Sequence, residues 1–164
     1  MDKQILILGL GNYLMGDEGL GVHFVQQMER EALPENVSVL DGGTGGFHLM
    51  SYLEDFPLII AVDATLDERP AGTIRLIRPR FSKDFPRALS THDVGLKDLL
   101  EGLQILGKFP EIHLFVVSVE TIQPLYIGLS DAVAAAMPEL ISQTKLLISQ
   151  LNKHTVAPDM SLIK

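Results

Sequence analysis

The chain contains no cysteine. Without thiols it cannot form disulfides, thiolate zinc sites or iron–sulfur clusters, and it has no cysteine nucleophile. The side chains that remain for binding a metal are histidine, aspartate and glutamate. A chain of 164 residues needs no disulfide or structural metal to be stable, because a domain of this size buries about 68–70% of the surface that its unfolded chain exposes. We therefore expect any metal site to serve function rather than stability.

Basic residues are in the minority. The chain has 13 Lys and Arg against 21 Asp and Glu, which gives a formal net charge of −8. Such a charge repels the phosphate backbone of nucleic acids. We therefore expect no nucleic-acid partner.

Long hydrophobic runs are also missing. The first apolar run, residues 5–10, is far too short to span a bilayer, and Gly11-Asn12 interrupts it where a signal peptide would continue. We expect a cytoplasmic protein that has no membrane partner.

No internal repeat, low-complexity tract or flexible linker divides the chain. With 46% hydrophobic residues, the composition fits one compact domain. We expect this domain to span residues 1–152, and the polar segment 153–164, which contains Pro158, to be a loosely held tail.

Short β-branched apolar runs alternate with segments of helical apolar spacing, which is typical of a sheet covered by helices. The expected strands are 4–8, 37–40, 58–62, 73–77 and 112–119. The expected helices are 19–31, 47–53, 94–106 and a last one capped by Ser130, which Pro138 interrupts or restarts before 139–151. The pattern predicts an α/β protein with an α/β/α sandwich architecture, in which a mostly parallel, twisted, five-stranded sheet lies between two helical layers.

One strand is expected to run against the others. Between Asp63 and Thr73 there is only a polar turn with Pro70 and Gly72, too short for the crossover that a parallel neighbour needs. We therefore predict that strand 73–77 is antiparallel.

A glycine-rich loop follows the first strand, from Gly9 to Gly21. It departs from the dinucleotide fingerprint, because Leu14 stands where a third glycine is needed, and from the phosphate loop, because Asp17-Glu18 replaces the Lys-Ser/Thr pair. Carboxylates there repel phosphate but suit a cation, and so many glycines commonly mark close approach to a ligand. Two alternatives stay open: the carboxylates only decorate the start of a helix, or the loop binds a nucleotide.

Several possible metal ligands follow strands of the predicted sheet. Glu18 comes after the first strand, Asp63 ends the third, and His92 precedes a helix. Because ligands bind beyond the carboxyl ends of parallel strands, we expect these three side chains to converge. Two carboxylates and one imidazole suit zinc, nickel or a similar divalent ion and leave coordination positions open.

Local roles remain possible for each of these residues. Asp63 could cap a turn, His92 could cap or pack against a helix, and Asp41, which also ends a strand, could form an Asx turn. The remaining histidines are expected to be bystanders: His23, His48, His113 and His154. A serine hydrolase is disfavoured, because the chain has no Gly-x-Ser-x-Gly elbow.

The chain resembles the hydrogenase maturation proteases, endopeptidases that trim the C-terminus of the large subunit of nickel–iron hydrogenases. The family's first signature, Gly-x-Gly-Asn-x-Leu followed by Asp-Glu-Gly-x-Gly, is met from Gly9 to Gly21. Its Asp-Gly-Gly-Thr signature is Asp41 to Thr44, its strand-ending Asp-Ala pair is Asp63-Ala64, and its Ser-x-His is Ser90-Thr91-His92. The resemblance covers nearly the whole chain, to about Leu151.

The resemblance implies that Glu18, Asp63 and His92 bind a metal. It further implies that the partner is the nickel–iron hydrogenase large-subunit precursor and that nickel already inserted in it is the recognition signal, with zinc or cadmium able to occupy the site in isolated protein. Docking would bring the scissile peptide to the glycine-rich cleft, where Gly42, Gly43 and Thr44 bind the substrate and Asp41 acts as base. Because the cleft must reach a large partner, we expect the free protein to be a monomer.

Three points are left open by the residues. Val119-Glu120-Thr121-Ile122-Gln123-Pro124 meets the family pattern after the last strand only partly, and this loop is expected to border the substrate groove. The same ligand set would also fit a non-catalytic, nickel-sensing chaperone module that docks on the precursor while another protein cuts it. Metal-assisted hydrolysis is the alternative to a base at Asp41.

Overall fold

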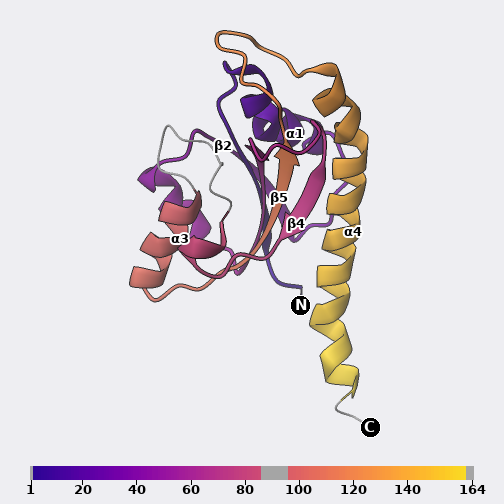
Figure 1. Ribbon diagram of the computed structural model, residues 1–164. Coiled ribbons are helices and arrows are strands. Elements are labelled where there is room, and N and C mark those ends of the chain that lie inside the picture. The colour runs from indigo at the N-terminus through magenta and orange to yellow at the C-terminus, as the bar shows by residue number, and fades with distance from the viewer. Residues whose placement is uncertain (1, 86–95, 162–164) are drawn as a thin grey trace.

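The computed structural model describes residues 2–85 and 96–161 of the chain (Figure 1). In these ranges it has five strands, β1 Ile5–Leu10, β2 Val37–Gly43, β3 Leu58–Thr65, β4 Ile74–Ile77 and β5 Glu111–Ser118. The α-helices are α1 Leu20–Met28, α2 Met50–Leu53, α3 Leu96–Ile105 and α4 Asp131–Ser161, and single 3-10 turns lie at η1 Gly16–Gly19, η2 Phe47–Leu49 and η3 Ser82–Asp84. All five predicted strands are present at the expected places.

The five strands form one sheet in the order β2-β1-β3-β5-β4. β1 pairs with β2 and β3 in parallel, and β3 pairs with β5 in parallel, so the carboxyl ends of these four strands share one edge. β4 is antiparallel, as predicted, and its partner is β5 rather than β3. The short turn after β3 therefore carries the chain past the position that β5 later fills between the two strands.

Alternate strand residues face opposite layers, as the two-residue period of a strand requires. Ile7 and Ile60 of β1 and β3 lie in one hydrophobic core, and Leu8 and Ala61, their next neighbours in the chain, lie in the other. Both cores are built from large aliphatic side chains that are almost completely buried. The sheet is therefore covered on both faces, which explains why its central strands are apolar throughout.

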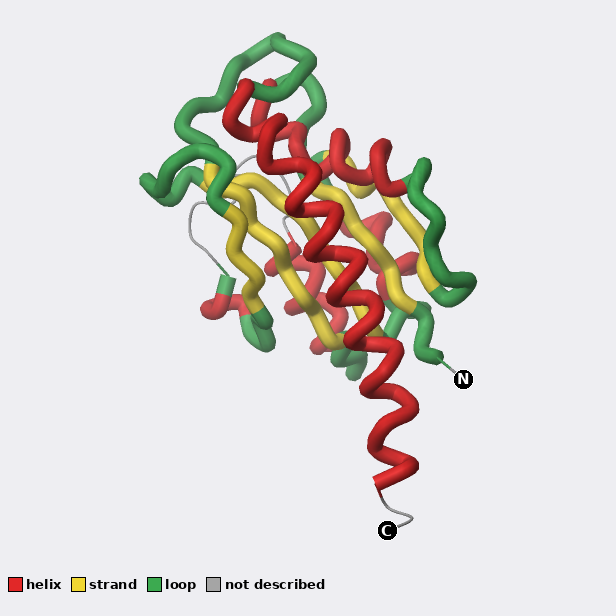
Figure 2. The backbone as a smooth tube through the Cα atoms, turned by 90° about the vertical axis from the view of Figure 1, so that its right-hand side faces the viewer, coloured by secondary structure: helices red, strands yellow, loops and turns green. Residues whose placement is uncertain are grey.

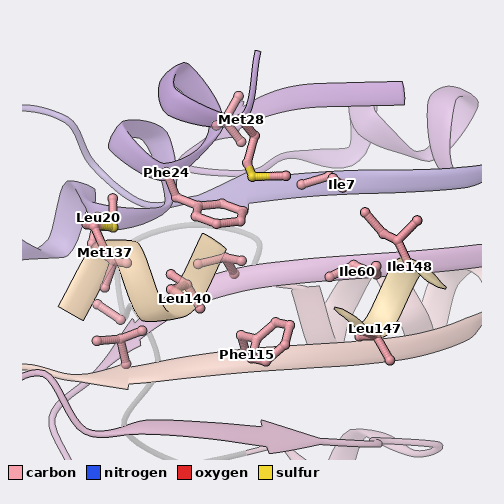
Figure 3. Packing of buried hydrophobic residues seen from close by; sticks show 14 of the residues in the cluster. Ile7, Leu20, Phe24, Met28, Ile60, Phe115, Met137, Leu140, Leu147 and Ile148 are labelled. Atoms are coloured by element: carbon pink, nitrogen blue, oxygen red, sulfur yellow. The ribbon is translucent and has the colours of Figure 1, made fainter. Parts of the chain in front are cut away.

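Each core is closed by one pair of helices. α1 and α4 cover the face that carries Ile7 and Ile60. The core between these helices and the sheet contains Phe24, Phe115 and Leu140 (Figure 3). The opposite face is covered by α2 and α3. The predicted three-layer α/β/α sandwich is thus confirmed.

The C-terminal helix differs from the expectation at Pro138. The sequence predicts that Pro138 interrupts or restarts the helix, but α4 continues through it from Asp131 to Ser161. A proline inside a helix removes one backbone hydrogen bond. Met137 and Leu140, buried on either side of it against the sheet, hold the helix in place.

α4 crosses the sheet and extends beyond it at its C-terminal end (Figure 2). The looseness predicted for residues 153–164 stays a prediction, although the helical backbone continues to Ser161. No helix in the described part of the chain is long and apolar enough to cross a membrane.

Candidate functional site

The glycine-rich loop after β1 is packed tightly against the chain itself. A Cβ atom on Gly9 would lie 2.1 Å from the carbonyl oxygen of Gly21, and one on Gly11 would lie 2.0 Å from the carbonyl oxygen of Glu18. Both contacts exclude any side chain, so these glycines let the start of α1 approach β1. The sequence predicts that these glycines allow a ligand to approach closely. At Gly9 and Gly11, however, the group in close contact is the backbone of the chain itself. The consequence is that Glu18 is held against the carboxyl edge of the sheet.

Asp63 lies near the carboxyl end of β3, with only 5% of its surface exposed. Its Oδ1 accepts a hydrogen bond of 2.8 Å from the Ala64 N–H. The pKa of Asp63 is raised to about 8, mainly by burial; the hydrogen bond from Ala64 opposes this rise, and the nearby charge of Glu18 contributes to it. A carboxylate in such surroundings is costly unless a proton or a cation accompanies it.

Glu18 supplies a second buried carboxylate beside Asp63. It is 4% exposed and lies in η1, directly before α1. Its Oε2 is buried and has no hydrogen-bond partner. Two neighbouring carboxylates, one with an unpartnered oxygen, form a donor set that fits a hard or borderline divalent cation.

His92, the third predicted ligand, lies outside the described residues. Asp63 alternates with Ile59 and Ala61, so it belongs to the face that α2 and α3 cover. α3 begins at Leu96 on that face and leads into β5 at the amino edge, so its N-terminus is directed towards the carboxyl edge. Within residues 2–85 and 96–161 no three potential ligands are grouped around one point. Convergence of all three ligands therefore stays a prediction.

Asp41 lies at the same edge, on the far side of β1. It pairs in register with Gly9, which pairs with Val62, the residue before Asp63. Two strand spacings separate these positions, or about 10 Å. The Asp41 side chain is exposed, and its Oδ1 accepts a 2.8 Å hydrogen bond from the Gly43 N–H, which makes an Asx turn.

The predicted substrate-binding residues follow Asp41 directly. Gly42 is buried against Leu8 and Leu10, whereas Thr44 is exposed. Gly43 has a positive φ of 54°, and its carbonyl oxygen accepts a 2.7 Å hydrogen bond from the Gly11 N–H. This bond ties the segment to the glycine-rich loop. Neither the substrate role of this segment nor the catalytic role of Asp41 is tested by the structure.

Asp17 has a structural role that the sequence did not reveal. Its Oδ1 accepts a 2.7 Å hydrogen bond from the Ser130 N–H, at the start of α4, and Gln123 contacts both its backbone and its carboxylate. Ser130, the predicted cap, directly precedes α4, and Asp17 is the carboxylate that binds its N–H. A partner so far away in the chain leaves no local signal in the sequence.

The other histidines that were predicted to be bystanders have separate surroundings. His113 is buried at the amino end of β5, where its Nε2 lies 2.8 Å from Glu111. His23 packs against the ring of Tyr13, with ring centroids 4.7 Å apart, and burial lowers its pKa despite the opposing charge of Asp17. His48 is exposed.

A hollow of about 540 Å³ opens next to the carboxyl ends of β3 and β5. It lies beside the edge that carries Asp63. The residues that line it are Leu66, Glu68, Arg69, Pro70, Val119 and Glu120.

Comparison with known proteins identifies the family. A family model for hydrogenase maturation proteases matches residues 22–145. The chain is 36% identical over 144 residues to the hydrogenase 2 maturation protease of Escherichia coli, a match that covers 85% of this chain and 87% of that protein. It is 38% identical over 121 residues to the hydrogenase expression/formation protein HupD of Bradyrhizobium diazoefficiens, which covers 71% of this chain and 62% of the length of that relative.

Solved structures agree with this result. The hydrogenase maturating endopeptidase HybD from Escherichia coli superposes with a TM-score of 0.81 at 33% identity, over 90% of this chain and 93% of that one. The hydrogenase maturation protease HybD from Thermococcus kodakarensis superposes with a TM-score of 0.72 at 27% identity, over 88% and 98% of the two chains. The sheet, its helical layers and the sequence signatures therefore agree, and the chain belongs to the hydrogenase maturation protease family.

Proposed function

We propose that this protein is an endopeptidase that removes the C-terminal extension of the nickel–iron hydrogenase large-subunit precursor after nickel has been inserted. The observation that carries the proposal is the buried pair of Glu18 and Asp63 at the carboxyl edge of the sheet. A protein gains nothing in stability from two adjacent buried carboxylates with an unpartnered oxygen, so their chemistry favours a cation that arrives with another molecule.

Nickel is the recognition signal in this proposal and belongs to the substrate. Glu18, Asp63 and His92 reach the ion that the precursor holds, and this contact orients the C-terminal extension. A precursor without nickel offers no ion and is left uncut. In the isolated protein, zinc or cadmium is proposed to occupy the same ligands.

Asp41 is proposed as the base that activates water. The Gly43 N–H fixes its carboxylate through Oδ1, and a carboxylate that accepts one hydrogen bond can still accept a proton. The oxygen of the activated water bonds to the scissile carbonyl carbon, the C–N bond breaks, and the proton passes to the leaving amine. Gly42, Gly43 and Thr44 are proposed to contact the substrate backbone near this point.

The free protein is proposed to be a monomer that acts in the cytoplasm. A large precursor must reach Glu18 and Asp63, so the carboxyl edge has to stay uncovered by a second copy. The net charge of −8 favours a protein partner over nucleic acid.

The test uses two purified components. Nickel-loaded or nickel-free precursor is incubated with the protein, and the masses of the products are measured. We expect the nickel-loaded precursor alone to lose a C-terminal peptide. Glu18→Gln, Asp63→Asn and His92→Ala should each abolish this loss, while Glu101→Gln, at an exposed position of α3, should not.

Two results would contradict the proposal. Full processing by His92→Ala would remove the ligand set from the mechanism. An unchanged precursor mass, together with formation of a stable complex, would instead favour the non-catalytic nickel-sensing module.

A further inference from the structure

Four large apolar side chains gather on two loop segments beside the site and face the solvent. We call them the apical patch. Its members and their exposed fractions are Leu14 at 52%, Leu125 at 90%, Tyr126 at 53% and Ile127 at 58%. Contiguous exposed apolar side chains cost solubility, and they commonly mark an interaction surface.

Backbone hydrogen bonds hold the two segments of the apical patch together. The Gly16 N–H donates to the Tyr126 carbonyl oxygen at 2.8 Å, and the Tyr126 N–H donates to the Leu14 carbonyl oxygen at 3.0 Å. Met15 and Tyr126 form an isolated parallel bridge. The patch is therefore an ordered part of the fold, attached to the same loop that places Glu18.

Leu125 has a backbone conformation that its side chain disfavours. Its φ is 56°, in the left-handed region that leucine rarely adopts, and its side chain is the most exposed of the large hydrophobic ones in the described part of the chain. A polar residue or glycine would be more stable and more soluble here. Because the strain presents a leucine to the solvent without any packing gain, the position points to a role in binding.

The patch lies where a large substrate must approach. The loop between β5 and α4, which carries three of its members, stands out beyond the carboxyl edge of the sheet (Figures 1 and 2). Glu18 and Asp63 are themselves buried at that edge. Tyr126 of the patch is hydrogen-bonded to Gly16, two residues before Glu18, so a folded protein that brings an ion to Glu18 approaches close to the patch.

We propose that the apical patch is the docking surface for an apolar area of the folded precursor next to its nickel. This inference rests on the proposed function and adds a second recognition element to it. The segment 125–128 has no charged residue, so it fits an apolar partner surface rather than an acidic or basic one. In this arrangement, contact with nickel distinguishes the nickel-loaded precursor from the nickel-free one, and the apical patch adds affinity for the precursor.

The test compares Leu125→Asn with the wild-type protein. Asparagine tolerates the left-handed conformation and is polar, so we expect the melting temperature to stay equal or to rise. For nickel-loaded precursor we expect KM to increase at least fivefold while kcat changes less than twofold. A residue with a merely structural role would move stability and activity in the same direction.

The matched control is Ile105→Asn. Ile105 is 85% exposed at the C-terminal end of α3, near the opposite edge of the sheet, and its substitution should leave KM unchanged. A wild-type KM for Leu125→Asn would overturn the inference. Two other results would also overturn it, because they assign the patch to another occupant. One is sedimentation data in which the wild-type protein is a dimer and the Leu125→Asn variant a monomer. The other is binding of the wild-type protein to neutral phosphatidylcholine vesicles that the Leu125→Asn variant has lost.

A binding measurement separates this inference from the proposed function. Affinity for nickel-loaded precursor is measured by calorimetry, which does not depend on cleavage. If the wild-type protein binds but does not cut, weaker binding by Leu125→Asn still supports the docking surface. If cutting occurs and both proteins bind equally well, the docking surface is wrong while the proposed function stands.

Discussion

The buried carboxylate of Asp63 lowers the stability of the fold, which an apolar or amide side chain at this position would not do. The residue is almost fully buried, and its pKa is raised to about 8 mainly by burial. The hydrogen bond from the Ala64 N–H compensates only in part. Such a position is expected where the carboxylate serves binding or catalysis, because function is often retained at the expense of stability.

Replacing this carboxylate should therefore stabilise the fold. For metal-free Asp63→Asn at pH 8 we expect the free energy of unfolding to rise by about 1–3 kcal/mol, because the amide oxygen can still accept the Ala64 N–H but carries no charge. Urea denaturation in the presence of a chelator measures the change. Asp55→Asn, at an exposed position, is the control, and a destabilised Asp63→Asn variant would argue against the buried-charge interpretation.

His113 predicts how stability responds to acid. Burial lowers its pKa below the usual 6.5, although its contact with Glu111 opposes this. Below pH 6.5 the unfolded chain therefore binds a proton more readily than the folded one, so stability should fall as the pH falls.

The expected loss between pH 7.5 and 5.5 is about 0.5–1 kcal/mol from this one group. His113→Phe should remove that part of the pH dependence, and His48→Ala, at an exposed histidine, should not. Equal slopes for wild-type protein and His113→Phe, measured by urea denaturation at several pH values, would speak against the assignment.

Among the elements, α4 depends on a residue from the other end of the chain. Asp17 accepts the Ser130 N–H at 2.7 Å although 113 positions separate the two residues. The same carboxylate and its backbone also contact Gln123 in the loop before the helix. Asp17 thus fastens α4 and the loop of the apical patch to the segment that carries Glu18.

Loss of this link should destabilise the protein. For Asp17→Ala we expect a loss of about 1–3 kcal/mol, because the Ser130 N–H and the Gln123 side chain lose a buried partner. Hydrogen exchange should locate the effect at the start of α4 and in residues 121–130. Asp131→Ala, which changes an exposed carboxylate in the first turn of the same helix, should cost less, and equal effects of the two substitutions would contradict the capping role.

The sequence could predict those features of a helix or strand that are caused by residues near to it in the chain. Runs such as residues 58–62 are apolar because both faces of β3 are covered, and the run itself reveals the strand. The antiparallel direction of β4 followed from the short turn that precedes it. Its pairing with β5 did not, since that depends on a strand that enters the sheet later.

The same distinction applies to Pro138 and to the candidate site. Because proline lacks a backbone N–H, Pro138 predicts a break in the helix. Its neighbours Met137 and Leu140, however, are buried in a core that exists only once the sheet has folded. Glu18 could be chosen because it follows a strand, and Asp63 because it lies near the carboxyl end of one. The unpartnered Oε2 of Glu18 and the positive φ of Leu125 occur where segments distant in the chain meet, so they could not be predicted from the sequence.

Over the whole molecule, topology brings the candidate residues to one edge of the sheet. β1 lies between β2 and β3, so the loops that follow these three strands meet at one edge with Asp41, Glu18 and Asp63. Ligand sites of open α/β sheets occur where neighbouring connections diverge in this way. The two helical layers cover both faces of this sheet.

The most direct test of the account is the position of a bound ion. Crystals grown with nickel or cadmium are analysed by anomalous diffraction, which identifies the metal and its ligands. We predict one ion bound jointly by Glu18, Asp63 and His92, with open coordination positions. An ion bound elsewhere, or an ion held by the two carboxylates while His92 points away from it, would contradict the account.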